Sequence, residues 1–443
     1  MTWLDRVPGG PAFFGPAPRM RAAPVPLANR ASPGRPLMAR PSTYVLAVAY
    51  ALGCWRIGGV LRDGFVAFPL ATVTATVLFT LYAVPFILLV RMIDYLAREP
   101  LRLQVLAVLW GGTVATSAAI SGGTAVADLL AKLASPEVAA AWGPAVSGAA
   151  VEEVVKVAGI AAIALIVPGR IKSVVDGFVY GALVGLGFQV VEDIVFGVDA
   201  VAAVGADTVV PVIATVLVRG FLGGLWSHTL FTALAGAGLA YAVVRRDRPR
   251  LQRVAVALLL FVTAAGFHFL WNSPLLGGGA GAGLLGVAAM LLVKGIPALL
   301  VGVALVVAAE RRQADYYAGM LAALADPRIA SQDEIATLVS PRRRVAARRR
   351  ARLRLGWAGA RAMRRLQRAQ AQLAVALSRD PGAEVLRRRR DVLSRRHQLL
   401  ALGMNGRGRP PRRPAVLIGA TVAEALVVGA LVLGVALAIR KLA

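Results

Sequence analysis

The chain has 443 residues, of which 58% are hydrophobic and 16% are charged, and its mean hydropathy is +0.67. Soluble domains contain about 45–50% apolar residues, so this composition excludes a water-soluble globular protein. The net charge is +27, and about half of the 50 lysines and arginines lie between Arg311 and Arg413, which is typical of membrane-protein loops rather than of an evenly basic nucleic-acid-binding domain.

The first 42 residues are rich in proline and arginine and contain no apolar core of a signal peptide. We expect residues 1–42 to form a disordered cytoplasmic tail. Met38 directly precedes the first apolar run, so an alternative is that translation starts there. Cys54 is the only cysteine, which excludes an intrachain disulfide.

Apolar runs long enough to cross a bilayer, about 20 residues each, recur along the chain. They predict an all-α fold, a polytopic transmembrane bundle of about eight core helices plus one C-terminal span. The predicted spans are 43–61, 65–90, 102–120, 139–167, 174–197, 225–244, 253–273, 281–309 and 415–439. The stretch 206–224 is also apolar but contains Arg219 and several glycines, and we interpret it as a re-entrant or interfacial segment.

Basic residues concentrate in the loops 91–102, 168–173, 245–253 and 310–414. Because cytoplasmic loops carry an excess of lysine and arginine, this distribution predicts a multi-pass protein of the cell membrane with a cytoplasmic N-terminus. Residues 43–309 would form the transmembrane core, and residues 415–443 would contain a C-terminal span.

Residues 310–414 are expected to form a basic, helical cytoplasmic segment. Ser331 with Glu334 three residues later is a capping-box pattern that predicts a helix start. The partner expected for such arginine-rich helices is the anionic lipid of the cytoplasmic leaflet, and a nucleic-acid partner is disfavoured.

Four of the predicted spans contain polar residues that are costly in lipid and usually mark function or paired structure. Span 139–167 contains Glu152, Glu153 and Lys156; span 174–197 contains Asp176, Glu192 and Asp193; span 225–244 contains His228; and span 253–273 contains His268 and Asn272. Glu152 and Lys156 are four residues apart and can pair on one helix face. We interpret Asp176 as a cap at the start of its helix.

The polar residues share helix faces with small residues, as an interior site requires. Glu192 continues a stripe formed by Gly177, Gly181, Gly185 and Phe188. Glycines at four-residue spacing mark a face that packs closely on another helix, so we expect Glu192 to point into the bundle. With the predicted orientation, all four polar elements lie in the outer half of the bilayer.

This set of residues predicts hydrolytic chemistry. A carboxylate can act as general base on water, and histidine and asparagine can donate hydrogen bonds to an oxyanion. Alternatively, histidine and glutamate can bind a zinc ion that lowers the pKa of bound water to about 7. Neither Cys54 nor Ser227 has a setting comparable to that of a catalytic nucleophile.

Four motifs resemble those of the PrsW-type intramembrane proteases, which are distantly related to the CAAX-type prenyl endopeptidases. The run Glu152-Glu153-Val-Val-Lys156 resembles the family's EExxK motif. The second motif is matched by Asp176-Gly177-x-x-Tyr180-Gly181 with Gly185-x-Gly187-Phe188-x-x-x-Glu192, the third by His228, and the fourth by His268-Phe-Leu-Trp271-Asn272. The resemblance covers roughly residues 43–309, which it identifies as a transmembrane protease core.

The resemblance implies roles for these residues. Glu152 or Glu153 would activate water, and Glu192 would stand where the CAAX relatives place a histidine. His268 and Asn272 would stabilise the oxyanion or help to hold a metal. Lys156 and His228 would support the site, and the candidate ligands of a divalent metal such as zinc are Glu153, Glu192, His228 and His268. A metal-free glutamate mechanism is the alternative.

The implied substrate is a single-pass membrane protein cut near its extracytoplasmic boundary, such as an anti-sigma factor. The sequence departs from the family pattern at Asp193, where asparagine is expected, and at Gln189, where a small residue is usual. Two functions from other classes remain as alternatives, namely an ion- or proton-coupled transporter that uses the buried carboxylates as a relay and a non-catalytic membrane scaffold.

Overall fold

The computed structural model describes residues 40–95, 99–167, 169–224, 227–275, 283–378 and 382–404. Within these ranges the regular structure is helical throughout and includes no strand, which confirms the all-α prediction. Residues 1–39 of the predicted tail and the predicted C-terminal span 415–439 lie outside the described residues. The described chain divides into two compact units, and the boundary falls within one helix between Tyr317 and Ala318.

The first unit is a helical bundle. Its elements in chain order are α1 (Pro41–Ala67), α2 (Pro69–Ile93), α3 (Leu101–Leu109), η3 (Trp110–Ala115), α4 (Thr116–Leu133), α5 (Pro136–Ser147), η4 (Gly148–Glu152), α6 (Glu153–Ile166), α7 (Val174–Val204), α8 (Val210–Thr215), η5 (Val216–Leu222), α9 (His228–Val244), α10 (Arg250–Asn272), α11 (Gly283–Met290), η7 (Leu291–Gly295) and α12 (Ile296–Ala322). The η elements are π-helical turns inside longer helices.

Six helices of the described chain are long and apolar enough to cross a membrane. They are Pro41–Ala67, Pro69–Ile93, Leu101–Leu133, Val174–Val204, Arg250–Asn272 and Ala288–Ala322. The chain is therefore a multi-pass membrane protein. The span predicted over 102–120 continues to Leu133, because η3 joins α3 to α4 without a break.

The segment that was interpreted as re-entrant or interfacial forms a separate short helix, α8–η5 (Val210–Leu222). At about 1.5 Å per residue it is roughly 20 Å long, less than the roughly 30 Å of the hydrocarbon layer. It packs against α7 and α2. Its position brings Arg219 beside α7, close to the candidate active site described below.

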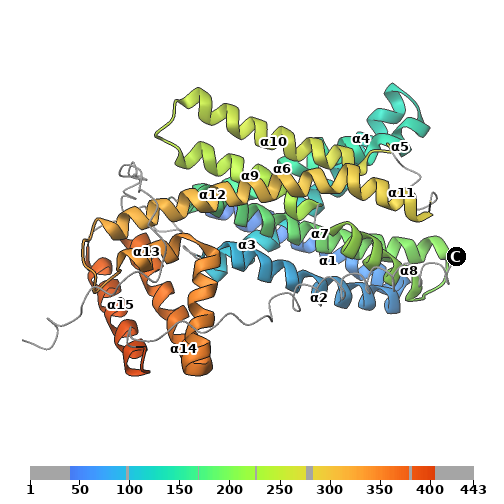
Figure 1. Cartoon of the computed structure of the whole chain (residues 1–443). Coiled ribbons are helices and arrows are strands. Elements are labelled where there is room, and N and C mark those ends of the chain that lie inside the picture. Colours follow the sequence, from blue (N-terminus) through green and yellow to red (C-terminus); the bar gives the residue numbers. More distant parts are fainter. Residues whose placement is uncertain are drawn as a thin grey trace, which may run out of the picture. The chain divides into compact units, whose positions relative to one another are not determined.

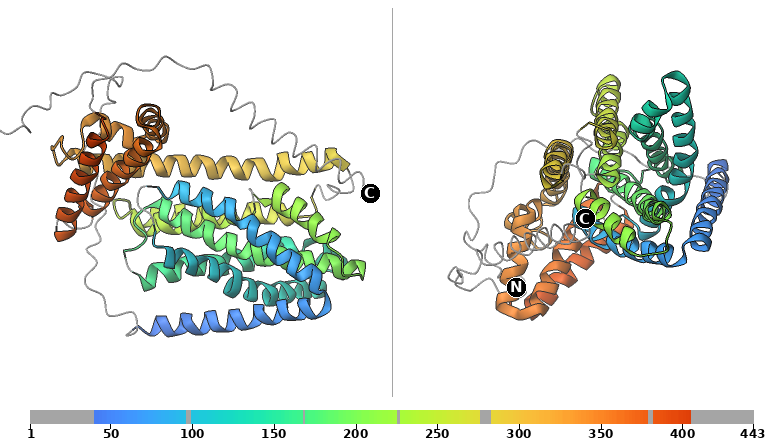
Figure 2. Two further views of the ribbon diagram at one scale, coloured as in Figure 1. Left: turned by 90° about the horizontal axis from the view of Figure 1, so that it is seen from below. Right: turned by 90° about the vertical axis from the view of Figure 1, so that its right-hand side faces the viewer.

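Helix α7 runs through the middle of the bundle, with α9 on one side and α2 on another (Figure 1). A Cβ atom on Gly181 would overlap the carbonyl oxygen of Thr232 in α9, and one on Gly185 would overlap that of His228. These glycines therefore let the two backbones touch, which confirms the predicted packing face. Figure 2 shows α1 at the margin of the bundle, and many of its apolar side chains are exposed, as on a lipid-facing helix.

A buried polar cluster lies at the start of α7. The Glu99 carboxylate accepts hydrogen bonds from Lys172 Nζ at 3.0 Å and from Tyr180 Oη at 2.6 Å, and the Glu99 amide donates to Asp94 at 2.8 Å. Asp176 forms a capping box with Ser173, which fits its interpretation as a cap. Burial raises the pKa of Asp94 to about 7.

The second unit contains the arginine-rich helices, and we call it the basic unit. Its helices are α13 (Gln332–Val339), α14 (Pro341–Leu377, with a kink at Gly356) and α15 (Ala383–Ala401). The predicted capping box of Ser331 and Glu334 is confirmed. An ion pair between Arg389 and Asp326 at 3.1 Å joins α15 to the segment before α13.

Candidate active site

Two adjacent glutamates enter the bundle where a π turn meets an α-helix. Glu152 is the last residue of η4 and Glu153 is the first residue of α6. The Glu153 side chain is fully buried, whereas 10% of the Glu152 side chain remains exposed. Glu152 is therefore the less enclosed of the two carboxylates.

Lys156 lies beneath both glutamates. Its Nζ is 3.0 Å from Glu152 Oε2, 3.1 Å from Glu153 Oε1 and 2.9 Å from His228 Nδ1. The ammonium also lies 3.7 Å from the centre of the Phe188 ring, a favourable cation–π position. The predicted pairing of Lys156 with Glu152 is confirmed, and it reduces the cost of burying these charges.

His268 of α10 is fixed by a carboxylate on one side and open on the other. Its Nδ1 is 3.0 Å from Glu153 Oε1, and its ring stacks on Phe231. Its Nε2 is buried without a hydrogen-bond partner and lies 3.7 Å from Glu152 Oε2. A buried nitrogen without a partner is costly, so Nε2 is the atom of this ring that could hold a metal ion or bond to a substrate.

His228 has a matching arrangement at the first turn of α9. Its Nε2 is 2.7 Å from Glu192 Oε2, and its Nδ1 is 3.8 Å from Glu152 Oε2. Glu192 thus points into the bundle, as its glycine-rich face predicted. Each histidine has one ring nitrogen on a carboxylate and the other within 3.8 Å of Glu152 Oε2, but this second nitrogen is bonded to Lys156 in His228 and has no hydrogen-bond partner in His268.

Arg219, on η5, also belongs to this site, although its position in the sequence did not predict a role there. Its guanidinium donates to Glu192 at 2.6 Å and to Asp193 at 2.5 Å, and it lies over the ring of Phe196. An arginine within an apolar stretch, and an acid at position 193 where the PrsW family pattern has asparagine, were signals that could have suggested the pair.

Asn272 lies at the edge of the site, one turn after His268. Its Nδ2 donates to the Pro144 carbonyl at 3.3 Å. A Cβ on Gly148 would come within 2.7 Å of His268 Nε2 and 3.1 Å of Asn272 Nδ2. Asn272 therefore faces the same stretch of backbone as the open nitrogen of His268, but it contacts neither glutamate.

The three atoms that face one another fit a metal ion. One ligand atom each from Glu152, His228 and His268 lies within 4.8 Å of the others. Two imidazoles and a carboxylate are a frequent zinc ligand set, and a carboxylate behind each imidazole is the usual support for such ligands. The expected set had Glu153 and Glu192 as ligands. In the structure these two glutamates instead hold the outer nitrogens of the histidines.

The charge of the site also suits a divalent cation. Four carboxylates (Glu152, Glu153, Glu192 and Asp193) face two basic side chains (Lys156 and Arg219) in the bundle interior. With neutral histidines, the ionised groups would leave two negative charges without a counter-ion, which is costly inside a membrane. Lys156 Nζ lies 2.9 Å from His228 Nδ1. A metal ion bound at His228 Nδ1 would therefore have to displace the Lys156 ammonium.

The part of the chain that contains this site matches a known protein family. Residues 99–307 match the family described as PrsW family intramembrane metalloprotease. These residues form a PrsW-family domain. The matched residues contain every residue of the site, and α1, α2 and the basic unit lie outside the match. No protein of curated function and no solved structure is detectably similar to the chain.

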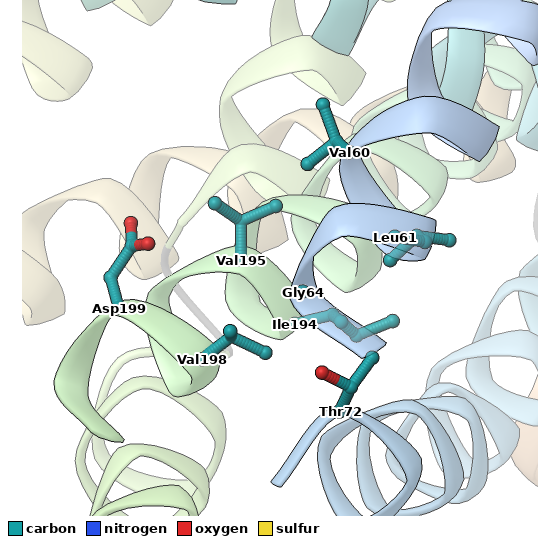
Figure 3. Close-up of a pocket in the computed structure, with 8 residues that line it drawn as sticks. All are labelled: Val60, Leu61, Gly64, Thr72, Ile194, Val195, Val198 and Asp199. Atoms are coloured by element: carbon teal, nitrogen blue, oxygen red, sulfur yellow. The ribbon is translucent and has the colours of Figure 1, made fainter. Parts of the chain in front are cut away.

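A separate cavity of about 120 Å³ lies between α1, α2 and the second half of α7 (Figure 3). Apolar side chains such as Val60, Leu61 and Ile194 line most of it, and Asp199 supplies its one carboxylate. It shares no residue with the PrsW site and contains no group that could act with Asp199 on a substrate.

Proposed function

We propose that the chain is an intramembrane endopeptidase that hydrolyses a peptide bond of a membrane protein near its extracytoplasmic boundary, with water activated beside Glu152. The observation that carries the proposal is the convergence of Glu152, His228 and His268, each of which offers one ligand atom within 4.8 Å of the others in the interior of a membrane-spanning bundle. Hydrolysis within lipid needs such an enclosed polar site, because water and charge are otherwise excluded there.

The residues divide the work as follows. Glu152 takes the proton of the attacking water as general base and then gives it to the amine nitrogen that leaves when the C–N bond breaks. As an imidazolium that donates Nδ1–H to Glu153, His268 donates Nε2–H to the oxyanion that develops on the scissile carbonyl, and Asn272 provides a second donor if its amide turns from the Pro144 carbonyl. Glu153 fixes the ring of His268, and Glu192 fixes the ring of His228.

The family description also implies a metal. Glu152, His228 and His268 would hold it, and a bound zinc ion would supply a lowered pKa of bound water and polarisation of the carbonyl. With the metal present, Glu153 and Glu192 would keep their hydrogen bonds to the outer histidine nitrogens and so orient both rings.

The proposed substrate is a single-pass membrane protein, and an anti-sigma factor is the proposed class. Support comes from the similarity of residues 99–307 to the PrsW family and from the distribution of basic loops, which predicts a site in the outer half of the bilayer.

Membrane proteomics tests the proposal. Cells would carry the wild-type chain, Glu152→Gln or Glu137→Gln at equal expression. Glu137 is an exposed carboxylate on α5, so its variant is a matched control. One or a few single-pass proteins should appear as truncated fragments with the wild type and with Glu137→Gln, and should stay intact with Glu152→Gln.

A fragment found in this way gives a substrate for purified cleavage with and without a chelator. Loss of cleavage on chelation and its return with zinc would support the metal-holding role of the three residues, and unchanged cleavage would support the metal-free mechanism. If no fragment differs while an ion or solute gradient does, the transporter alternative replaces the protease.

A further inference from the structure

Helix α14 of the basic unit is a helical hairpin. Gly356 has a φ of +63°, which ends the first half, and the second half continues to Leu377. The two halves lie side by side, since Arg348 Nε donates to Gln367 Oε1 at 2.7 Å and Gln367 Nε2 donates to the Arg344 carbonyl at 3.4 Å. The turn at Gly356 is therefore the tip of the hairpin.

Large apolar side chains are exposed at this tip. Leu353 is 59% exposed and Trp357 is 61% exposed. The guanidinium of Arg352 lies 3.7 Å from the centre of the Trp357 ring, so the indole has a cation on one face. An exposed leucine beside an exposed tryptophan loses the benefit of burial, which indicates that another surface covers them.

The charges around the tip indicate which kind of surface covers it. Helix α14 contains twelve arginines and no acidic residue. Arg349, Arg352 and Arg361 are exposed on either side of Gly356. A second copy of this hairpin would meet like charge, whereas an anionic bilayer offers both counter-charge and an apolar layer directly beneath it. Tryptophan is enriched at that boundary, and arginine can extend its head to the phosphates.

We propose that the α14 tip, defined as Arg349, Arg352, Leu353, Trp357 and Arg361, inserts into the interface of an anionic phospholipid bilayer. The arginines bind lipid phosphates, and Leu353 with the Trp357 indole enters the headgroup–acyl boundary. The basic unit is thereby anchored to the membrane by a contact that is independent of the transmembrane helices and of the peptidase site.

The full chain, reconstituted in nanodiscs, tests the proposal. In a Cys54→Ser background, Leu353→Cys carries an environment-sensitive NBD label, and Gln332→Cys, an exposed position on α13, carries the same label as the control. In discs that contain phosphatidylglycerol, the label at 353 should shift to the blue and be quenched by doxyl-labelled lipid. Neither change should occur in pure phosphatidylcholine or at position 332.

The charge dependence is tested with two variants of the labelled chain. Arg349→Gln with Arg352→Gln should lower the equilibrium constant for insertion by roughly 30-fold, whereas Arg349→Lys with Arg352→Lys should retain most of it. Equal emission in both lipids, or a blue shift without doxyl quenching, overturns the proposal. So does a shift that inorganic phosphate or an RNA oligonucleotide produces in phosphatidylcholine discs, because the anion would then not be the bilayer.

Discussion

At the scale of single residues, the two adjacent glutamates of the PrsW motif have different surroundings. Glu153 is enclosed and accepts hydrogen bonds from Lys156, His268 and Thr232. Glu152 keeps an open side toward both histidines. Under the proposed function, these surroundings favour Glu152 as the reacting carboxylate and Glu153 as the residue that orients His268.

This assignment predicts unequal losses of activity. Glu152→Gln should lower the rate of substrate cleavage by roughly 10²- to 10⁴-fold, as expected for a lost general base. Glu153→Gln should lower it by roughly 10- to 100-fold, as expected for a lost partner of a site histidine. Initial rates with the purified enzyme decide the order, and a larger loss for Glu153→Gln would reverse the two roles.

Arg219 should influence His228 through Glu192. Arg219→Gln removes the hydrogen bond that holds the Glu192 carboxylate, and we expect cleavage and zinc affinity each to fall by roughly 10- to 100-fold. Arg219→Lys, which preserves the charge, should restore part of both. Zinc titration followed by the cleavage assay measures the two effects, and full activity of Arg219→Gln would show that Glu192 is held without it.

At the scale of helices, the contact of α7 with α9 determines where His228 and Glu192 meet. Gly181→Ala would force the two backbones apart and should destabilise the protein by roughly 1–3 kcal/mol. Gly266→Ala in α10 is the matched control, because its Cβ would meet nothing within 4 Å. It should be stabilising by about 0.5–1 kcal/mol.

Thermal unfolding in one detergent compares these two variants. A lower midpoint for Gly181→Ala and an unchanged or higher midpoint for Gly266→Ala are expected. If both variants behave alike, the close approach of α7 and α9 does not contribute to stability.

The sequence predicted much of the site because lipid makes polar residues conspicuous. Glu152, His228 and His268 interrupt apolar runs, and the faces they share with small residues predicted their convergence. The pairing of Arg219 with Glu192 could not be predicted, since it depends on where η5 packs after α7 ends at the left-handed Gly205. The sequence also could not predict that the basic unit starts within α12, because the helix periodicity continues across Tyr317 and Ala318.

At the scale of the whole molecule, the Glu99 cluster joins the α2–α3 connection to the α6–α7 connection. Asp94 lies in this cluster outside the spans, and its pKa in the folded chain, about 7, is above its ordinary value of 3.8. The folded chain therefore holds this proton more tightly than the unfolded chain. The resulting stabilisation is complete below about pH 4 and is lost as the pH rises to about 7.

Asp94→Asn should remove this part of the pH dependence. The wild type should lose thermal stability relative to Asp94→Asn between pH 5 and pH 8, while Asp247→Asn, at an ion pair in the α9–α10 loop, should leave the trend in place. Unfolding midpoints in the same lipid at several pH values provide the measurement. Parallel curves for wild type and Asp94→Asn would exclude a raised pKa at this carboxyl group.

The π turn η4 limits which deletions the gene for this protein can tolerate. A π turn holds one residue more than the α turn it replaces, and η4 ends at Glu152, the first of the two glutamates. In-frame loss of a single codon, for Ala149 or Ala150, would turn η4 into an α turn and rotate the glutamates by about 100° relative to α5. Both carboxylates would remain in the protein but would no longer face His228 and His268. The number of residues before Glu152 is therefore as constrained as the identity of Glu152, and a one-residue gap here in a homologue would indicate a lost site.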